Sequence, residues 1–191
     1  MKQLSTPFLF WFASVIGIFS VTSCQKSTDP PPAKDPVKIV ILNPSFEQNL
    51  DAWKIETAYT GRYGFSSDTI ARNTGRFGLN FYASQVGHFT NAPQETPWNG
   101  KIYQTITGLK DGTYILRAYA DATGTGMYLW ANGGTADAKI LIKSRNSEIN
   151  TLEFVVQGGT AKFGFACIDA GGDVTILAPY FHADDVELLL K

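Results

Sequence analysis

The stretch IYQTITGLKDGTYILRAYA, residues 102–120, alternates apolar and polar side chains on both sides of a Lys-Asp-Gly turn. After the turn, residues 114, 116 and 118 would point to one face of a strand and residues 115, 117 and 119 to the other. A period of two in a run rich in β-branched and aromatic residues is typical of a strand. The stretch therefore predicts two strands joined by a turn.

The same pattern recurs along most of the chain and is separated by turn signals rich in Gly and Asp. No segment has the pattern of a helix, and no repeat of fixed period is found. Strands are predicted over 37–42, 77–83, 101–107, 113–120, 126–132, 138–143, 149–157, 161–169 and 180–190. Many short strands between Gly and Asp turns predict an all-β fold, an antiparallel β-sandwich of the jelly-roll kind.

The first 23 residues have the character of a signal peptide. A positive start at Lys2 precedes an uncharged apolar run over 7–21, which is too short to span a membrane as a stable helix. The sequence Val-Thr-Ser before Cys24 resembles a bacterial lipobox, which implies cleavage before Cys24 and lipidation of that residue as a membrane anchor. A plain secretory signal with an accidental cysteine is the alternative.

Residues 24–36 form a tether, because residues 25–36 hold four prolines and too few apolar side chains to fold. Residues 37–191 are then one domain, long enough to bury a core. Lipoproteins on the outer membrane of Bacteroidetes-type bacteria look similar, with a polar stretch after the lipidated cysteine. The resemblance implies a cell-surface lipoprotein, and a periplasm-facing position stays open.

The charge of the chain excludes nucleic acid as a predicted partner. Without Lys2 the mature chain holds 15 basic residues, one fewer than the 16 of the whole chain, against 17 acidic ones, so its net charge is −2. Apart from Cys24, Cys167 is the only cysteine, so no disulfide can form within the domain. Its alternating apolar surroundings predict a buried, inert thiol.

Three segments in this order carry a family resemblance: NPSFEQNLDAW at 43–53, the stretch at 102–120 and ADDVELLL at 183–190. They look like the first strand, the central hairpin and the last strand of a galactose-binding-domain-like sandwich, the fold of many carbohydrate-binding modules. The resemblance implies a protein that binds glycan or polysaccharide without catalysis. It also implies partners among the surface proteins of a polysaccharide-utilisation system.

The resemblance further implies a structural calcium where the first and last strands lie close together. Its ligands would be Glu47, one of Asp184 and Asp185, and the carbonyl of Asn43. Strand alternation puts Asp184 on the core side with the apolar residues of its strand and so favours it over Asp185. In the alternative, Glu47 and Asp184 only cap backbone amides. Phe46 and Trp53 are expected to anchor the core.

Aromatic rings that could stack on sugars are predicted from strand alternation. Tyr128 and Trp130 would share the face opposite Met127 and Leu129. One patch of aromatic and cationic side chains is expected, with Trp98 and Trp130 exposed as stacking anchors; its members are Trp98, Tyr103, Arg117, Tyr119, Tyr128 and Trp130. The alternatives are that Tyr128 and Trp130 pack inside the sandwich, or that the patch contacts another protein. If the rings are buried, the site would move to Tyr59, Tyr63 and Phe65.

No catalytic constellation is found in the sequence. His88 and His182 stand far apart without a nucleophile or a metal motif beside them. A structural or adhesive surface module that binds protein is the second functional hypothesis. A glycoside hydrolase is the third, because paired carboxylates cannot be recognised from sequence when nothing selects the pair.

Overall fold

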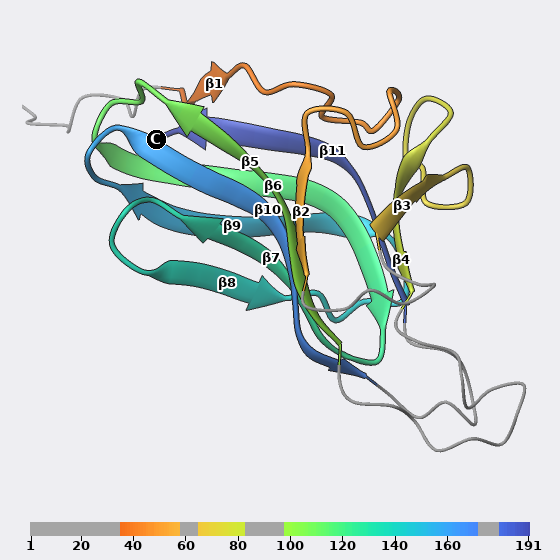
Figure 1. Cartoon of the computed structure of the whole chain (residues 1–191). Helices are drawn as coiled ribbons and strands as arrows, with labels where there is room; N and C mark the ends of the chain where they lie inside the picture. The colour runs from red at the N-terminus through yellow and green to blue at the C-terminus, as the bar shows by residue number, and fades with distance from the viewer. Residues whose placement is uncertain (1–34, 58–64, 83–97, 172–179) are drawn as a thin grey trace, which may run out of the picture. The chain divides into compact units, whose positions relative to one another are not determined.

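The computed structural model describes residues 35–57, 65–82, 98–171 and 180–191 (Figure 1), which all belong to a compact unit from Lys34 to Lys191. The described residues form strands and turns and no helix, so they include no helix that could cross a membrane. The strands are β1 (Val37–Ile39), β2 (Lys54–Thr57), β3 (Phe65–Asp68), β4 (Gly78–Tyr82), β5 (Trp98–Thr107), β6 (Gly112–Thr123), β7 (Thr125–Asn132), β8 (Asp137–Leu141), β9 (Glu148–Val156), β10 (Thr160–Gly171) and β11 (Tyr180–Leu190).

These strands build two antiparallel sheets. The six-stranded sheet has the order β3-β4-β11-β6-β9, with β1 paired to β11, and the five-stranded sheet has the order β2-β5-β10-β7-β8. The longest strands, β6, β10 and β11, lie inside the sheets, and the edge strands β2, β3 and β8 are short, whereas the edge strand β9 has nine residues. The prediction of an all-β antiparallel sandwich is therefore confirmed.

One pairing implied by the resemblance is wrong. The resemblance implies a hairpin over 102–120, but β5 belongs to the five-stranded sheet and β6 to the six-stranded sheet. The turn between them crosses the sandwich and is held by the β9–β10 turn, where Leu109 N–H donates to Gly159 O at 3.0 Å. A turn signal specifies where the chain reverses, but it does not specify whether the two strands bond to each other.

The core lies between the sheets, and strand alternation fills it. In β6, Tyr114, Leu116 and Ala118 are buried, while the residues between them are partly exposed, as the sequence pattern predicts. Phe46 and Trp53 are both buried, and their rings stack with centroids 4.9 Å apart. Both therefore anchor the core, as predicted.

The first and last strands lie side by side, because β1 pairs with β11 from Val37 opposite Leu190 to Ile39 opposite Leu188. Each of the nine predicted strands is present. The structure adds β2 and β3, whose sequences KIET and FSSD are short and mostly polar. Such segments lack the apolar run on which strand prediction depends.

Candidate functional site

The outward face of the five-stranded sheet carries two aromatic rings that meet across a glycine. Gly164 of β10 lies opposite Tyr103 of β5 on one side and opposite Trp130 of β7 on the other. Because Gly164 has no side chain, the two rings approach each other over β10. Their centroids are 6.1 Å apart, and their planes are inclined by 68°.

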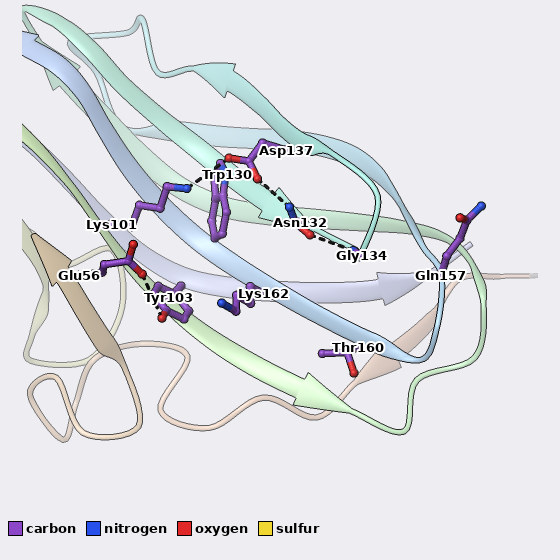
Figure 2. Close-up of a pocket in the computed structure, with 10 residues that line it drawn as sticks. All are labelled: Glu56, Lys101, Tyr103, Trp130, Asn132, Gly134, Asp137, Gln157, Thr160 and Lys162. Carbon is purple, nitrogen blue, oxygen red and sulfur yellow. Dashed lines mark hydrogen bonds and ion pairs between the residues drawn. The ribbon is translucent and has the colours of Figure 1, made fainter.

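A hollow of about 370 Å³ opens around this aromatic pair. Its walls come from β2, β5, β7, β8, β10 and the turns at one end of the sheet (Figure 2). Apart from the two rings and one glycine, every lining residue is polar or charged: Glu56, Lys101, Tyr103, Trp130, Asn132, Gly134, Asp137, Gln157, Thr160 and Lys162. The hollow thus combines ring surfaces with many hydrogen-bonding groups, as small-molecule sites do.

Three lysines on this face lie over three aromatic rings. The Nζ of Lys101 is 4.1 Å from the centroid of the Trp130 ring. The Nζ of Lys139 is 4.7 Å from the Tyr128 ring, and the Nζ of Lys162 is 5.3 Å from the Tyr103 ring. These distances are those of cation–π contacts.

Lys101 also reaches across Trp130 to the opposite wall, where its Nζ lies 3.2 Å from Asp137 Oδ2 (Figure 2). Asn132 Nδ2 donates to the other oxygen of Asp137 at 2.7 Å. Burial acts to raise the pKa of Asp137, but the hydrogen bonds and charge of Asn132, Trp130 and Lys101 outweigh it, and the pKa is lowered. Asp137 is therefore a stable anion that fixes Lys101 over the ring.

Trp130 is 2% exposed, although it points away from the core. Its buried indole N–H lies beside Asp137 and helps to lower the pKa of that carboxyl, but forms no hydrogen bond of good geometry with the described residues. On the other wall, the Tyr103 hydroxyl donates to Glu56 Oε2 at 3.3 Å. Burial and the nearby Glu56 carboxylate raise the pKa of Tyr103, so the hydroxyl keeps its proton.

The structure brings three of the predicted ligand-binding residues together. Tyr103, Tyr128 and Trp130 lie on the outward face of the five-stranded sheet, since Met127 and Leu129 point into the core. The alternative in which Tyr128 and Trp130 pack inside the sandwich is therefore wrong. The expected exposure of Trp130 is also wrong, because Lys101 covers its ring.

Two other members of the predicted patch lie elsewhere. Arg117 and Tyr119 belong to β6 in the six-stranded sheet, so the expectation of a single patch is wrong. The chain changes sheets at Gly124, between β6 and β7, and strand alternation within one segment does not show such a crossing. Trp98 begins β5, but its side chain lies outside the described part of the structure.

Of the second set of candidates, Tyr59 and Tyr63 lie outside the described residues, and Phe65 packs against Phe81 with centroids 5.2 Å apart. Sequence reasoning missed the lysines and the two carboxylates of the hollow. Alternation in β5 could have placed Lys101 beside Tyr103. No sequence signal shows that its ammonium crosses to a ring on β7.

Glu47 links the loop after β1 to the loop before β4. Its Oε1 accepts the backbone N–H of Arg76 at 2.6 Å and that of Phe77 at 2.9 Å. The Asn43 carbonyl oxygen accepts the indole N–H of Trp53 at 3.0 Å. The carboxylate and the carbonyl predicted as metal ligands thus both accept hydrogen bonds from the protein.

Asp184 is fully buried at an irregularity of β11. Its Oδ2 accepts the N–H groups of Asn73 at 2.6 Å and Thr74 at 3.0 Å, and its Oδ1 accepts the N–H of Asp185 at 2.8 Å. Burial raises the pKa of Asp184 despite these bonds. Burial acts to raise the pKa of Asp185 as well, but hydrogen bonds from Thr74, Ser45 and Asn73 outweigh it and lower that pKa.

Calcium at Glu47, Asn43 and Asp184 stays a prediction. Among the residues that the structure describes, no three His, Cys, Asp or Glu side chains are grouped so that they could hold an ion. Backbone N–H donors point at the carboxylates and occupy part of their acceptor capacity. The arrangement favours the alternative in which Glu47 and Asp184 cap backbone amides.

His182 forms a pair with Asp121, whose Oδ2 lies 3.5 Å from the imidazole Nδ1. The Ser147 hydroxyl donates to Oδ1 of the same carboxylate at 2.6 Å. The serine thus contacts the acid, whereas in a nucleophile–base–acid triad it would contact the imidazole. His88 lies outside the described residues.

No family model and no curated protein matches the sequence significantly, but solved structures match the fold. TmCBM61, solved in complex with β-1,4-galactotriose, is 15% identical with a TM-score of 0.57 over 79% of this chain and 97% of that one. A family 16 carbohydrate-binding module is 15% identical with a TM-score of 0.51 over 78% and 99% of the two chains.

A third match is the K1 cleaved adhesin domain of Lys-gingipain from Porphyromonas gingivalis W83. It is 14% identical with a TM-score of 0.53, over 83% of this chain and 99% of the adhesin domain. The chain therefore has the β-sandwich fold of these carbohydrate-binding modules and adhesin domains. At such low identity the likeness concerns the fold alone.

Proposed function

We propose that this chain binds glycan or polysaccharide, without catalysis, on the outward face of its five-stranded sheet. The observation that carries the proposal is the aromatic pair of Tyr103 and Trp130 across Gly164, set in a hollow of polar side chains. Sugar rings present apolar C–H faces that stack on aromatic rings, and hydroxyl groups that need hydrogen-bonding partners. The solved complex of TmCBM61 with β-1,4-galactotriose supports the proposal at the level of the fold.

Each part of the hollow has a role in this proposal. Tyr103 is half-buried and offers a ring to a sugar that enters over β10. Asn132 and Glu56 lie close enough to bind hydroxyl groups at the walls. A sugar that is to reach Trp130 has to displace the Lys101 side chain, so the Trp130 ring becomes available only when the ligand or thermal motion moves that lysine.

The cellular setting is part of the same proposal. Lipidation at Cys24 would hold the mature chain on the outer membrane, and the proline-rich tether would let the sandwich reach polysaccharide outside the cell. A binding protein in this position would work with other surface proteins of a polysaccharide-utilisation system. Structural calcium at Glu47, Asn43 and Asp184 remains a prediction within this proposal.

The experiment compares the variants Tyr103→Ala and Tyr119→Ala by calorimetric titration with polysaccharide oligomers. Both tyrosines are partly exposed on outward faces, but they belong to different sheets, so Tyr119→Ala is a matched control. Truncation of an aromatic anchor at the centre of a binding surface typically costs ~2 kcal/mol, which is about 30-fold in Kd. Trp130 is less suitable, because truncation of so buried a ring also destabilises the fold.

We expect Tyr103→Ala to weaken binding at least about tenfold, and Tyr119→Ala to bind as the wild type does. Both melting curves should show a folded domain. Equal losses in the two variants, or a loss in Tyr119→Ala alone, would remove the site from the five-stranded sheet.

The matched adhesin domains favour a second candidate function, a surface module that adheres to protein. In that case a broad glycan array would give no signal for the wild type. Tyr103→Ala would instead weaken capture of a defined protein partner.

A further inference from the structure

Basic side chains gather on the outward face of the five-stranded sheet, although the whole chain has a net charge of −1. Strand register places four lysines on this face, and the hollow among them is lined by two acids, Glu56 and Asp137; the lysines are Lys54, Lys101, Lys139 and Lys162. Both acids are already engaged, since Glu56 accepts the Tyr103 hydroxyl and Asp137 holds Lys101. The face therefore carries an excess of positive charge.

Three of these lysines, Lys54, Lys139 and Lys162, are without a carboxylate partner in the part of the chain that the structure describes, and two of them lie over rings. Lys139 and Lys162 are exposed, and each ammonium lies over a tyrosine ring, at 4.7 and 5.3 Å from the centroid. A cation–π contact orients an ammonium group but leaves its N–H donors and its charge unneutralised. Both cations therefore remain available to a ligand.

Lysines associated with the six-stranded sheet are arranged differently. Lys38 lies 2.6 Å from Glu187, and Lys191 lies 2.9 Å from Glu153. Lys38 and Lys191 thus have carboxylate partners, whereas Lys139 and Lys162 on the outward face of the five-stranded sheet do not, among the residues that the structure describes.

We propose that the ligand of the hollow is an anionic glycan, whose sugar rings carry carboxylate or sulfate groups. The inference rests on the proposed function and adds the chemical class of the ligand. A neutral sugar that stacks on the rings must push the ammonium groups away from them. An anionic glycan binds with one charged group at Lys162 and a sugar ring against Tyr103 in the hollow, and where the chain continues over β7 a further charged group meets Lys139 above Tyr128.

The test uses polygalacturonate and its fully methyl-esterified form, which have the same backbone and differ in charge. Titrations in 50 mM salt with chelator present, which prevents cross-linking of the polymer by calcium, should give a Kd at least tenfold lower for the anionic form. The ratio of the two Kd values should fall as salt is raised to 500 mM, because ions screen the attraction.

The variants Lys139→Met and Lys162→Met keep most of the apolar stem and lose the charge. Each should bring the ratio of the two Kd values several-fold closer to one. Lys191→Met removes a lysine of the other sheet and should leave the ratio unchanged. A sulfated galactan that binds in place of polygalacturonate would support the anionic class and assign sulfate as the charged group.

Two outcomes would overturn the inference, and only the second would also refute the proposed function. If the esterified polymer or neutral β-1,4-galactan binds as tightly as the anionic polymers and Tyr103→Ala still weakens that binding, the glycan site stands and its anionic character is wrong. If neither neutral nor anionic polymers bind, both the inference and the proposed function fail.

Discussion

Replacement of Asp184 by asparagine tests how the last strand is fixed to the loop before β4. The carboxylate is fully buried and accepts three backbone N–H groups, two at Oδ2 and one at Oδ1. An asparagine offers one carbonyl oxygen, so it can keep the pair from Asn73 and Thr74. Its amide NH₂ would then face the N–H of Asp185, and a buried donor would lose its acceptor.

The expected loss of stability follows from these bonds. An N–H left without an acceptor inside a protein costs roughly 1–3 kcal/mol, and each remaining bond weakens by about 1 kcal/mol when its acceptor loses its charge. The neutral side chain no longer carries the burial penalty that raises the pKa of Asp184, which offsets part of this. A net loss of about 3 kcal/mol would lower the Tm by about 6–12 °C in a domain of this size.

The measurement is thermal unfolding followed by circular dichroism, with Asp51→Asn as the control. Asp51 is exposed, and exposed substitutions usually change stability by less than about 0.5 kcal/mol. A Tm for Asp184→Asn within about 2 °C of the wild type would refute the reasoning, since that corresponds to less than ~1 kcal/mol. If calcium raises the Tm of the wild type relative to chelator and does not change the Tm of Asp184→Asn, Asp184 would instead be assigned as a ligand of the ion.

Two other predictions concern titratable side chains. The pKa of Asp137 is lowered in the folded state, so the stability it contributes is fully present above its unfolded pKa of about 3.9 and is lost as the pH falls through the folded value. The Tm of Asp137→Asn should therefore fall less steeply on acidification than the Tm of the wild type. An equally steep fall in the two proteins would contradict this. Burial raises the pKa of the Cys167 thiol well above its usual range, so a thiol reagent at pH 8 should label Cys167 in the urea-unfolded chain and leave Cys167 unlabelled in the folded chain. Rapid labelling of Cys167 in the folded protein would contradict the burial.

Local pattern in the sequence was sufficient to predict strand positions and the side to which each residue points. Tyr114 and Met127 face the core and Tyr128 faces outward because alternation follows from strand geometry alone. The partners of a strand depend instead on contacts between residues far apart in the chain. Alternation therefore predicts one surface for Arg117 and Trp130, although their strands belong to different sheets.

Irregular backbone and long side chains limit prediction in the same way. Alternation predicted that Asp184 faces the core, and it is buried, but the register shifts between Asp184 and Glu187, and Asp185 adopts a φ of 48°. Nothing in a period of two shows this shift. The cover of Trp130 by Lys101 depends on a side chain that spans a neighbouring strand, which only the assembled sheet can show.

Gly164 ties the shape of the hollow to the ability of the chain to fold. A Cβ at this position would collide with the backbone carbonyl of Ile102 on the neighbouring strand. Variants with a larger side chain at Gly164 would therefore misfold, whatever their effect on the hollow. The exposed lysines beside the hollow carry no such restriction, so the charge around the hollow can change while the backbone beneath it stays the same.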